Sequence, residues 1–208
     1  MNQDNYEEIF AAAWNRDGHT SIEFDPLDVN QVLADEYDCG EGLALTRTQL
    51  WDMEVKKAAR PDLFIPGVIR AGTARSWGRR ELKSGDEVFI RVSEQRLWLQ
   101  PDSYGAVIEA CYLNHSSQQV TFIGLPEVED DEGRTVTASS RQPLFHVTHG
   151  VSGAEEAPLN TWRIVHLTSD ENGVLFQRFE LMSQVSGLPE YVERYIEDVL
   201  KNPLTRKQ

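Results

Sequence analysis

The sequence lacks most of the features that assign a protein to a class at first reading. It has only two cysteines, Cys39 and Cys111, and no CxxC, so no disulfide framework is expected and both thiols are predicted to be reduced. No run of about 18 apolar residues is present, so no membrane-spanning helix is predicted. The opening residues, MNQDNYEEIF, lack the basic and then apolar pattern of a secretory signal. We therefore expect a cytoplasmic protein.

Short catalytic and metal-binding motifs are missing as well. No GxSxG, P-loop or GxGxxG occurs, which disfavours an elbow-type serine hydrolase, a nucleotide hydrolase and a dinucleotide enzyme. No HxH or HExxH occurs, and the acidic run 127–133 lacks the alternating oxygen ligands of a calcium loop. We predict no metal and no cofactor.

The charge is strongly negative but uneven. There are 34 acidic and 20 basic side chains, a net charge of −14, which argues against a nucleic-acid partner. Residues 56–96 nevertheless hold ten of the cations and only five of the acids. This window is either a set of solvated strand and loop faces or a site for an anionic ligand or an acidic carrier protein. Trp77 lies within it and could stack on a planar ligand or be buried.

The 208 residues, 40% of them hydrophobic, are enough for a sizeable core, and their periodicity changes along the chain. Helices are predicted at 5–16, capped by Asn5, and at 48–59, before Pro61. A third, at 188–200, repeats apolar residues at helical spacing and would lie on an apolar surface. Between them, short turns separate runs with strand character, which predicts an antiparallel sheet that curls or closes. The predicted strands are 21–24, 43–46, 69–77, 86–93, 106–113, 119–125, 134–139, 143–151, 161–168 and 173–181; the stretch 35–42 is predicted to be an acidic loop.

The order of elements in 43–72, 143–168 and 173–200 resembles the START/Bet v1-like helix-grip superfamily, which includes polyketide cyclases, aromatases and lipid-transfer domains. The resemblance implies an α+β fold in which a curved antiparallel sheet of about seven or eight strands grips a long C-terminal helix. Residues 43–208 would form this cavity domain, and residues 1–42 would be an N-terminal helical arm. The alternative architecture is a calycin-type β-barrel, similar to lipocalins. Either likeness implies an interior cavity, which in the helix-grip family holds an apolar or polycyclic molecule.

Polar residues on the predicted strands are the candidate site residues. Side chains alternate along a strand, so His146 and His149 are expected on opposite faces, whereas His146 and His166 could meet across neighbouring strands. His146 and His166 are therefore the candidate general acid and base, the alternative being hydrogen-bonded sheet histidines. An arginine that points into a cavity would need an anionic partner and could bind a carboxylate or phenolate of the ligand. Strand alternation alone does not decide which face is inward. The candidate ligand-binding residues are Arg75, Trp77, Arg91, Tyr112, Trp162, Arg163 and Tyr195.

Three functions are compatible with these observations. The first is a cyclase, aromatase or dehydratase that acts on an apolar or polyketide-like molecule within the cavity. The second is a non-catalytic carrier of a lipid or polycyclic ligand in the same cavity. The third is an interaction protein with a solid barrel, in which residues 1–42 dock on a partner or on a second subunit of a homodimer.

Overall fold

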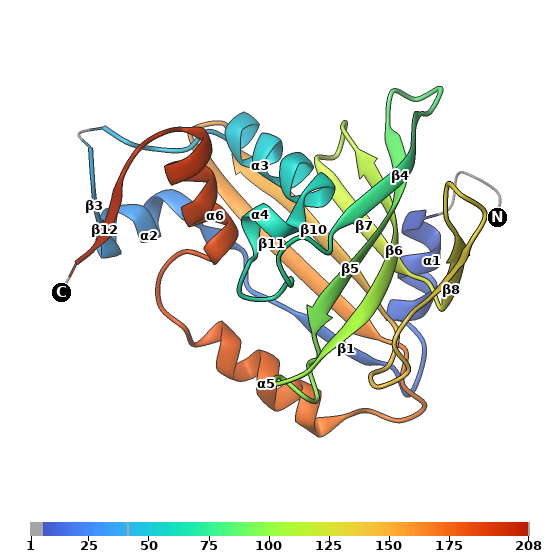
Figure 1. Cartoon of the computed structure of the whole chain (residues 1–208). Helices are drawn as coiled ribbons and strands as arrows, with labels where there is room; N and C mark the ends of the chain where they lie inside the picture. Colours follow the sequence, from blue (N-terminus) through green and yellow to red (C-terminus); the bar gives the residue numbers. More distant parts are fainter. Residues whose placement is uncertain (1–5, 41, 208) are drawn as a thin grey trace.

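The computed structural model describes residues 6–40 and 42–207, and its main feature is one antiparallel sheet of eight strands. Seven strands follow the order β1-β11-β10-β7-β6-β5-β4, and β2 pairs with β11 beside β1. Strand β1 therefore lies next to β11, the last strand of this sheet along the chain. From β11 to β4 the neighbours follow in reverse chain order (Figure 1). The strands are β1 (Thr20–Glu23), β2 (Leu27–Asp28), β4 (Arg75–Glu81), β5 (Glu87–Arg96), β6 (Tyr104–Asn114), β7 (Gln119–Gly124), β10 (Phe145–Ala154) and β11 (Ala157–His166).

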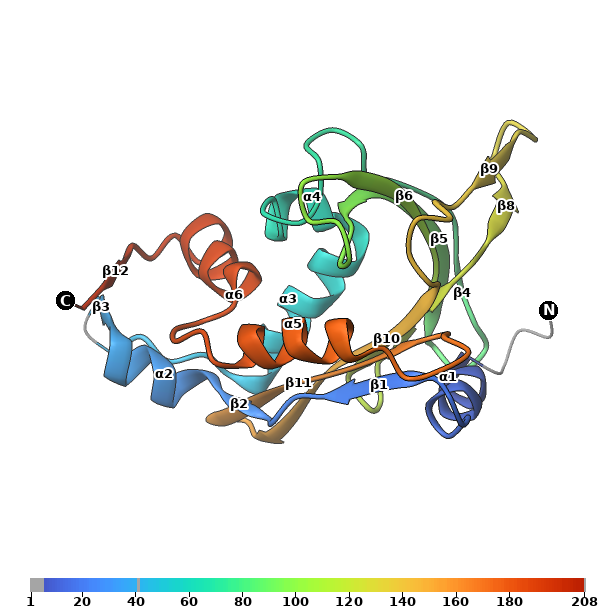
Figure 2. The same cartoon turned by 90° about the horizontal axis from the view of Figure 1, so that it is seen from below.

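The sheet is curved and open, and helices cover both of its faces. Its path runs from β1 to β4 without joining the two edges, so the described chain does not form the calycin-type barrel. Figure 2 shows α3 (Arg47–Ala59) and α5 (Gly173–Ser183) inside the curve, while α1 (Tyr6–Trp14) lies outside it. The predicted α+β fold with a curved antiparallel sheet is confirmed.

The two faces of the sheet carry separate apolar clusters. On the convex face, Phe10 and Ala13 of α1 pack with Ala110, Ile123 and Val165. The larger cluster fills the concave side, where α3, α5 and the C-terminal helical segment meet inward-facing strand residues such as Phe89, Cys111, Phe122, Val147 and Ile164. The side chains that alternate along the central strands thus enter one of two cores.

Helix α3 is placed by local signals that the sequence contains. Thr46 and Gln49 form a capping box at its start: the Thr46 hydroxyl accepts from the Gln49 amide, and the Gln49 side chain accepts from the Thr46 amide. The helix ends before Pro61, which opens the short helix α4 (Pro61–Phe64). The helix predicted at 48–59 is confirmed.

The C-terminal helical segment begins as α6 (Glu190–Arg194) and continues as a π-helical turn, η1 (Tyr195–Val199). Tyr191, Tyr195 and Ile196 are buried, as the apolar spacing of 188–200 predicts. None of the helices in the described residues combines the length and the apolar character that a membrane crossing requires. The remaining elements are α2 (Val29–Glu36), the strand pair β3 (Tyr37–Cys39) and β12 (Leu204–Arg206), and the hairpin of β8 (Glu127–Glu129) and β9 (Thr135–Thr137).

Several predicted elements differ from the structure. Residues 173–181 were expected to be a strand but form α5, because the Asn172 side chain caps a helix whose buried residues, Leu175 and Phe179, are four apart. Residues 43–46 lie outside the sheet, since Thr46 serves as the cap of α3. The strand predicted at 69–77 begins only at Arg75, and 35–42 holds the end of α2 and the strand β3 rather than a loop alone. The predicted cap Asn5 lies outside the described residues.

Candidate functional site

The candidate site lies between α3 and the concave face of the sheet, and two charged side chains of α3 begin it. Glu54 and Lys57 are one helical turn apart and point inward together with Leu50 and Met53. The side chain of Glu54 is 0% exposed and that of Lys57 is 4% exposed. Charged side chains are almost never buried this fully unless they are paired, and these two form an ion pair of 2.6 Å.

A continuous chain of polar contacts extends from this ion pair. The ammonium of Lys57 donates to Nδ1 of His149 on β10 at 2.8 Å. Glu54 accepts from the Nδ2 of Asn160 on β11 at 2.9 Å, and the Oδ1 of Asn160 accepts from the hydroxyl of Tyr191 on α6 at 2.8 Å. The chain therefore runs Tyr191, Asn160, Glu54, Lys57, His149 and joins two helices to two strands.

Burial and pairing set the protonation of this chain. Burial alone would raise the pKa of Glu54, but the Lys57 ammonium outweighs it and holds that pKa well below its usual range. Burial lowers the pKa of Lys57 to about 8, although Glu54 opposes the shift. Burial and the Lys57 charge lower the pKa of His149, which is neutral near pH 7. At that pH the centre therefore consists of a carboxylate, an ammonium and a neutral imidazole.

Aromatic side chains surround the imidazole. The His149 ring stacks on Trp162, with centroids 5.2 Å apart, and meets the edges of Phe122 and Tyr191 at 6.0 Å. The Lys57 ammonium also lies 3.8 Å from the centre of the Tyr191 ring. Because Nδ1 of His149 accepts from Lys57, Nε2 carries the ring hydrogen and is the nitrogen left to contact a ligand.

A second buried ion pair fixes α3 to the sheet next to this chain. Arg91 on β5 donates to Glu109 on β6 at 2.7 Å and to the carbonyl of Ala58, near the end of α3, at 2.9 Å. Its guanidinium also lies over the Phe122 ring. Arg91 thus points inward, as strand alternation allows, and its carboxylate partner belongs to the protein itself.

The predicted catalytic histidines are not brought together. His146 pairs with Val165 and His166 with Phe145 in the β10–β11 register, so they lie on opposite faces of the sheet. His146 is on the convex side, where its Nδ1 accepts from the Gly124 amide at 3.1 Å. His166 is on the concave side, between Phe145 and Phe179.

The predicted ligand-binding residues divide in the same way. Arg91, Trp162 and Tyr195 face the concave side, where the Tyr195 hydroxyl donates to Asp52 of α3 at 2.8 Å. The other four belong to the convex side: Arg75 pairs with Asp130 and Asp131, Trp77 lies against Arg75, Tyr112 stacks on Tyr6, and Arg163 lies over Phe10 and Trp14.

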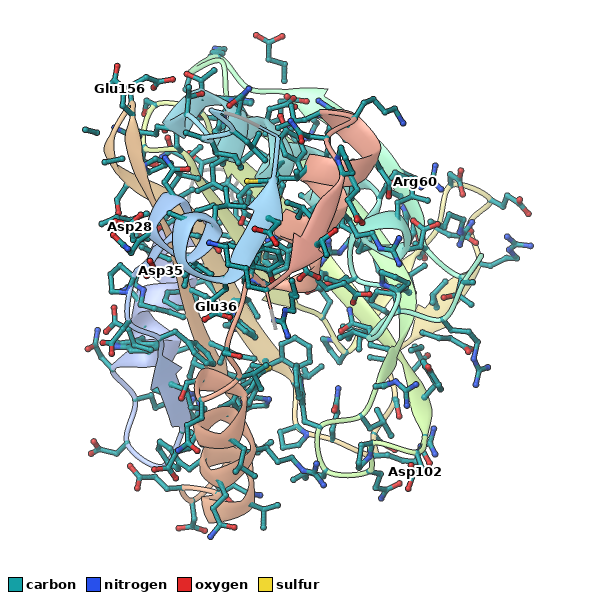
Figure 3. The ribbon with its side chains drawn as sticks, turned by 90° about the vertical axis from the view of Figure 1, so that its left-hand side faces the viewer. Asp28, Asp35, Glu36, Arg60, Asp102 and Glu156 are labelled. Carbon is teal, nitrogen blue, oxygen red and sulfur yellow. The ribbon has the colours of Figure 1, made fainter. Side chains whose placement is uncertain are left out.

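Most cations of the basic window 56–96 have acidic partners in the structure. Ion pairs are formed by Lys56, Lys57, Arg60, Arg70, Arg75, Arg79 and Arg91. In Figure 3, Asp28, Asp35, Glu36 and Glu156 lie on the α2 side of the molecule, away from Arg60. The predicted acidic carrier protein and homodimer stay predictions.

Sequence reasoning missed Glu54, Lys57, Asn160 and Tyr191 as site residues and set His149 aside. A signal for two of them was present, since Glu54 and Lys57 interrupt the apolar face of a well-capped helix at a spacing of three. Asn160 carries no such signal, because a single asparagine near a strand end is ordinary. No group of three or more histidine, cysteine, aspartate or glutamate side chains that could hold a metal occurs in the part of the chain that the structure describes.

Comparison with known proteins identifies the fold. The sequence matches no family model and no curated protein. Among solved structures it is similar to the Zhui aromatase/cyclase from Streptomyces sp. R1128, with a TM-score of 0.53 and 9% identity over 86% of this chain and 95% of that chain. The di-domain ARO/CYC StfQ from the steffimycin biosynthetic pathway gives a TM-score of 0.45 and 10% identity over 89% of this chain and 47% of that chain. Ara h 8.0201 gives a TM-score of 0.46 and 8% identity over 80% of this chain and 91% of that chain.

The chain has the START/Bet v1-like helix-grip fold, as its element order predicts. The likeness to the aromatase/cyclase is one of fold alone, because so little of the sequence is shared. The function must therefore be argued from the side chains of this protein.

Proposed function

We propose that this protein binds an apolar, carbonyl-bearing small molecule on the concave side of its sheet and moves protons at that molecule, as a cyclase- or dehydratase-type enzyme does. One observation carries the proposal: Glu54, Lys57 and His149 form a buried chain of ionisable groups against the aromatic wall of Trp162, Phe122 and Tyr191. Buried, coupled ionisable groups are expensive for stability and concentrate at functional sites.

The chain can act as acid and base in turn. His149 gives its Nε2 hydrogen to the ligand's carbonyl oxygen while Nδ1 takes a proton from Lys57. Nε2 is then unprotonated and takes a proton from the carbon beside the carbonyl. When Nδ1 returns its proton to Lys57, the protein is unchanged and the ketone has become an enol. An enol is the nucleophile that an intramolecular ring closure requires.

The surrounding residues have supporting roles. Glu54 holds Lys57 charged in spite of burial, and Asn160 and Tyr191 orient Glu54. The rings of Trp162 and Phe122 border His149 and would form the apolar wall beside which the ligand's carbonyl group meets Nε2.

The test is exchange of the α-hydrogens of 2-tetralone, a bicyclic ketone, for deuterium in D₂O, followed by proton NMR. We expect the protein to accelerate the exchange, and both Lys57→Met and His149→Phe to lower the rate by about 100-fold. Lys56→Met is the matched control, because Lys56 is the preceding residue of α3 and is exposed, and this variant should keep the rate of the wild type. The rate should also fall as pH rises through about 8, where Lys57 loses its proton.

Exchange at the rate of the buffer alone, or equal loss in Lys56→Met and Lys57→Met, would refute proton transfer by this chain. Binding of 2-tetralone without exchange would favour the predicted non-catalytic carrier instead.

A further inference from the structure

A second buried group of polar side chains lies next to the proton-transfer chain, and it is incomplete. His166 is fully buried, and neither of its ring nitrogens has a hydrogen-bond partner within residues 6–40 and 42–207. The indole nitrogen of Trp162 is also buried without a partner there. Buried polar groups normally have partners, so three nitrogens in one region without a partner among the described residues mark a place suited to a ligand with a hydrogen-bonding group.

A phenylalanine of α5 fills the space between these groups. The Phe179 ring lies 4.7 Å from the ring of Trp98, 5.7 Å from that of His166, 6.0 Å from that of Phe24 and 6.1 Å from that of Trp162, centre to centre. We call these four surrounding rings the aromatic box. The flat ring of Phe179 occupies the box, and Phe179 has no nitrogen or oxygen in its side chain with which His166 or Trp162 could form a hydrogen bond.

Helix α5 is attached through few side chains. Leu175 and Phe179 are its buried residues, whereas Val174, Phe176 and Leu181 are exposed apolar side chains on the same helix. Figure 1 shows α5 at the lower end of the molecule, joined to α6 by an extended connection. Undocking α5 would withdraw its two buried side chains and the partly buried Met182 from the concave cluster, and would uncover the rings that Phe179 contacts.

We propose that Phe179 is a removable plug, and that the aromatic box is a subsite for a flat aromatic ring bearing a hydroxyl group that hydrogen-bonds to His166. The proposal rests on the proposed function and names the ligand class for the same interior, since Trp162 is a wall of the box and also stacks on His149. A ring in the box would thus lie beside the proton-transfer chain.

The chemistry of His166 fits such a ligand. Burial lowers its pKa to about 4, so the imidazole is neutral and has one donor nitrogen and one acceptor nitrogen. A phenolic hydroxyl can donate to the acceptor nitrogen or accept from the donor nitrogen. The box would hold the ring by tilted and edge-on aromatic contacts like those of Phe179, and displacement of Phe179 would offset part of the binding energy.

The test is isothermal titration calorimetry with 2-naphthol, and with naphthalene as the matched ligand that lacks the hydroxyl. Phe179→Ala removes the plug and should tighten 2-naphthol binding by about tenfold, because the competent state no longer has to be opened. Phe176→Ala is the control on the exposed side of the same helix and should bind as the wild type does. In the Phe179→Ala background, His166→Phe should weaken 2-naphthol by about fivefold and leave naphthalene unchanged.

A second measurement protects the test against a folding defect in Phe179→Ala. In the wild type, saturation with 2-naphthol should speed amide hydrogen exchange in residues 173–183 and shift the ring-nitrogen NMR signals of His166. Unchanged exchange in α5 with unchanged His166 signals would overturn the plug, as would equal affinity in Phe179→Ala and Phe176→Ala. His149→Phe should still bind 2-naphthol, so loss of deuterium exchange in that variant refers to the proposed function and not to the box.

Discussion

Replacement of Lys57 by methionine should be among the most destabilising single changes on α3. The substitution leaves the carboxylate of Glu54, 0% exposed, without the cation that lies 2.6 Å away. Breaking a buried pair by removing one partner costs about 3–5 kcal/mol. The donor to His149 is lost as well, which adds about 1 kcal/mol. We therefore expect the free energy of unfolding to fall by about 4–6 kcal/mol.

Two companion variants separate this cause from general damage to the helix. The double variant Glu54→Gln with Lys57→Met removes the unpaired charge, while the glutamine amide can still accept from Asn160. Its free energy of unfolding should therefore exceed that of Lys57→Met by about 2 kcal/mol or more. Lys56→Met breaks the exposed ion pair with Asp52 on the same helix and should cost at most about 0.5 kcal/mol.

The assay is urea unfolding at pH 7, followed by circular dichroism, with comparison of midpoints at constant slope. If Lys57→Met costs no more than Lys56→Met, the pair is solvated and the reasoning is wrong. A double variant as unstable as the sum of its single changes would show that the two side chains are not coupled.

Two further predictions concern other buried groups. Because burial lowers the pKa of His166 from 6.5 to about 4, the unfolded chain takes up this proton first, so stability present above pH 6.5 should be lost as pH falls to 4. Between pH 7 and pH 4.5, the free energy of unfolding measured in urea should fall by up to about 3 kcal/mol less in His166→Phe than in the wild type. An equal fall in both proteins would contradict the lowered pKa of His166. Cys111 is fully buried with a raised pKa, whereas Cys39 is partly exposed, so a thiol reagent should label Cys39 in the native protein and Cys111 only after unfolding. Rapid labelling of both thiols would mean that the concave core opens readily.

The elements predicted correctly are those whose signals are local. The helix at 48–59 has its cap, its apolar side and Pro61 within a short stretch. In the strands around 86–93 and 106–113, side chains alternate between the two faces, and turn residues flank each segment. The segment 173–181 was misread because a short apolar run fits a strand and a helix alike, and the cap at Asn172 decides for the helix.

The sequence by itself determined which segments have strand or helix character and how side chains alternate along the strands. From that alternation it predicted correctly that His146 and His149 face opposite sides of the sheet. Only the tertiary structure decided which face is inside. That choice depends on where α1 and α3 pack, and no local pattern contains this information.

The candidate site depends on the same long-range packing. Glu54 meets Asn160 across 106 residues of chain, and Lys57 meets His149 across 92. A charged residue on a helix is ordinary until the fold removes water from it, and only then does it need a partner and acquire a shifted pKa. The sequence therefore contains the ionisable residues of the site, but only the folded chain buries them and brings them into contact, and their shifted pKa values follow from that burial.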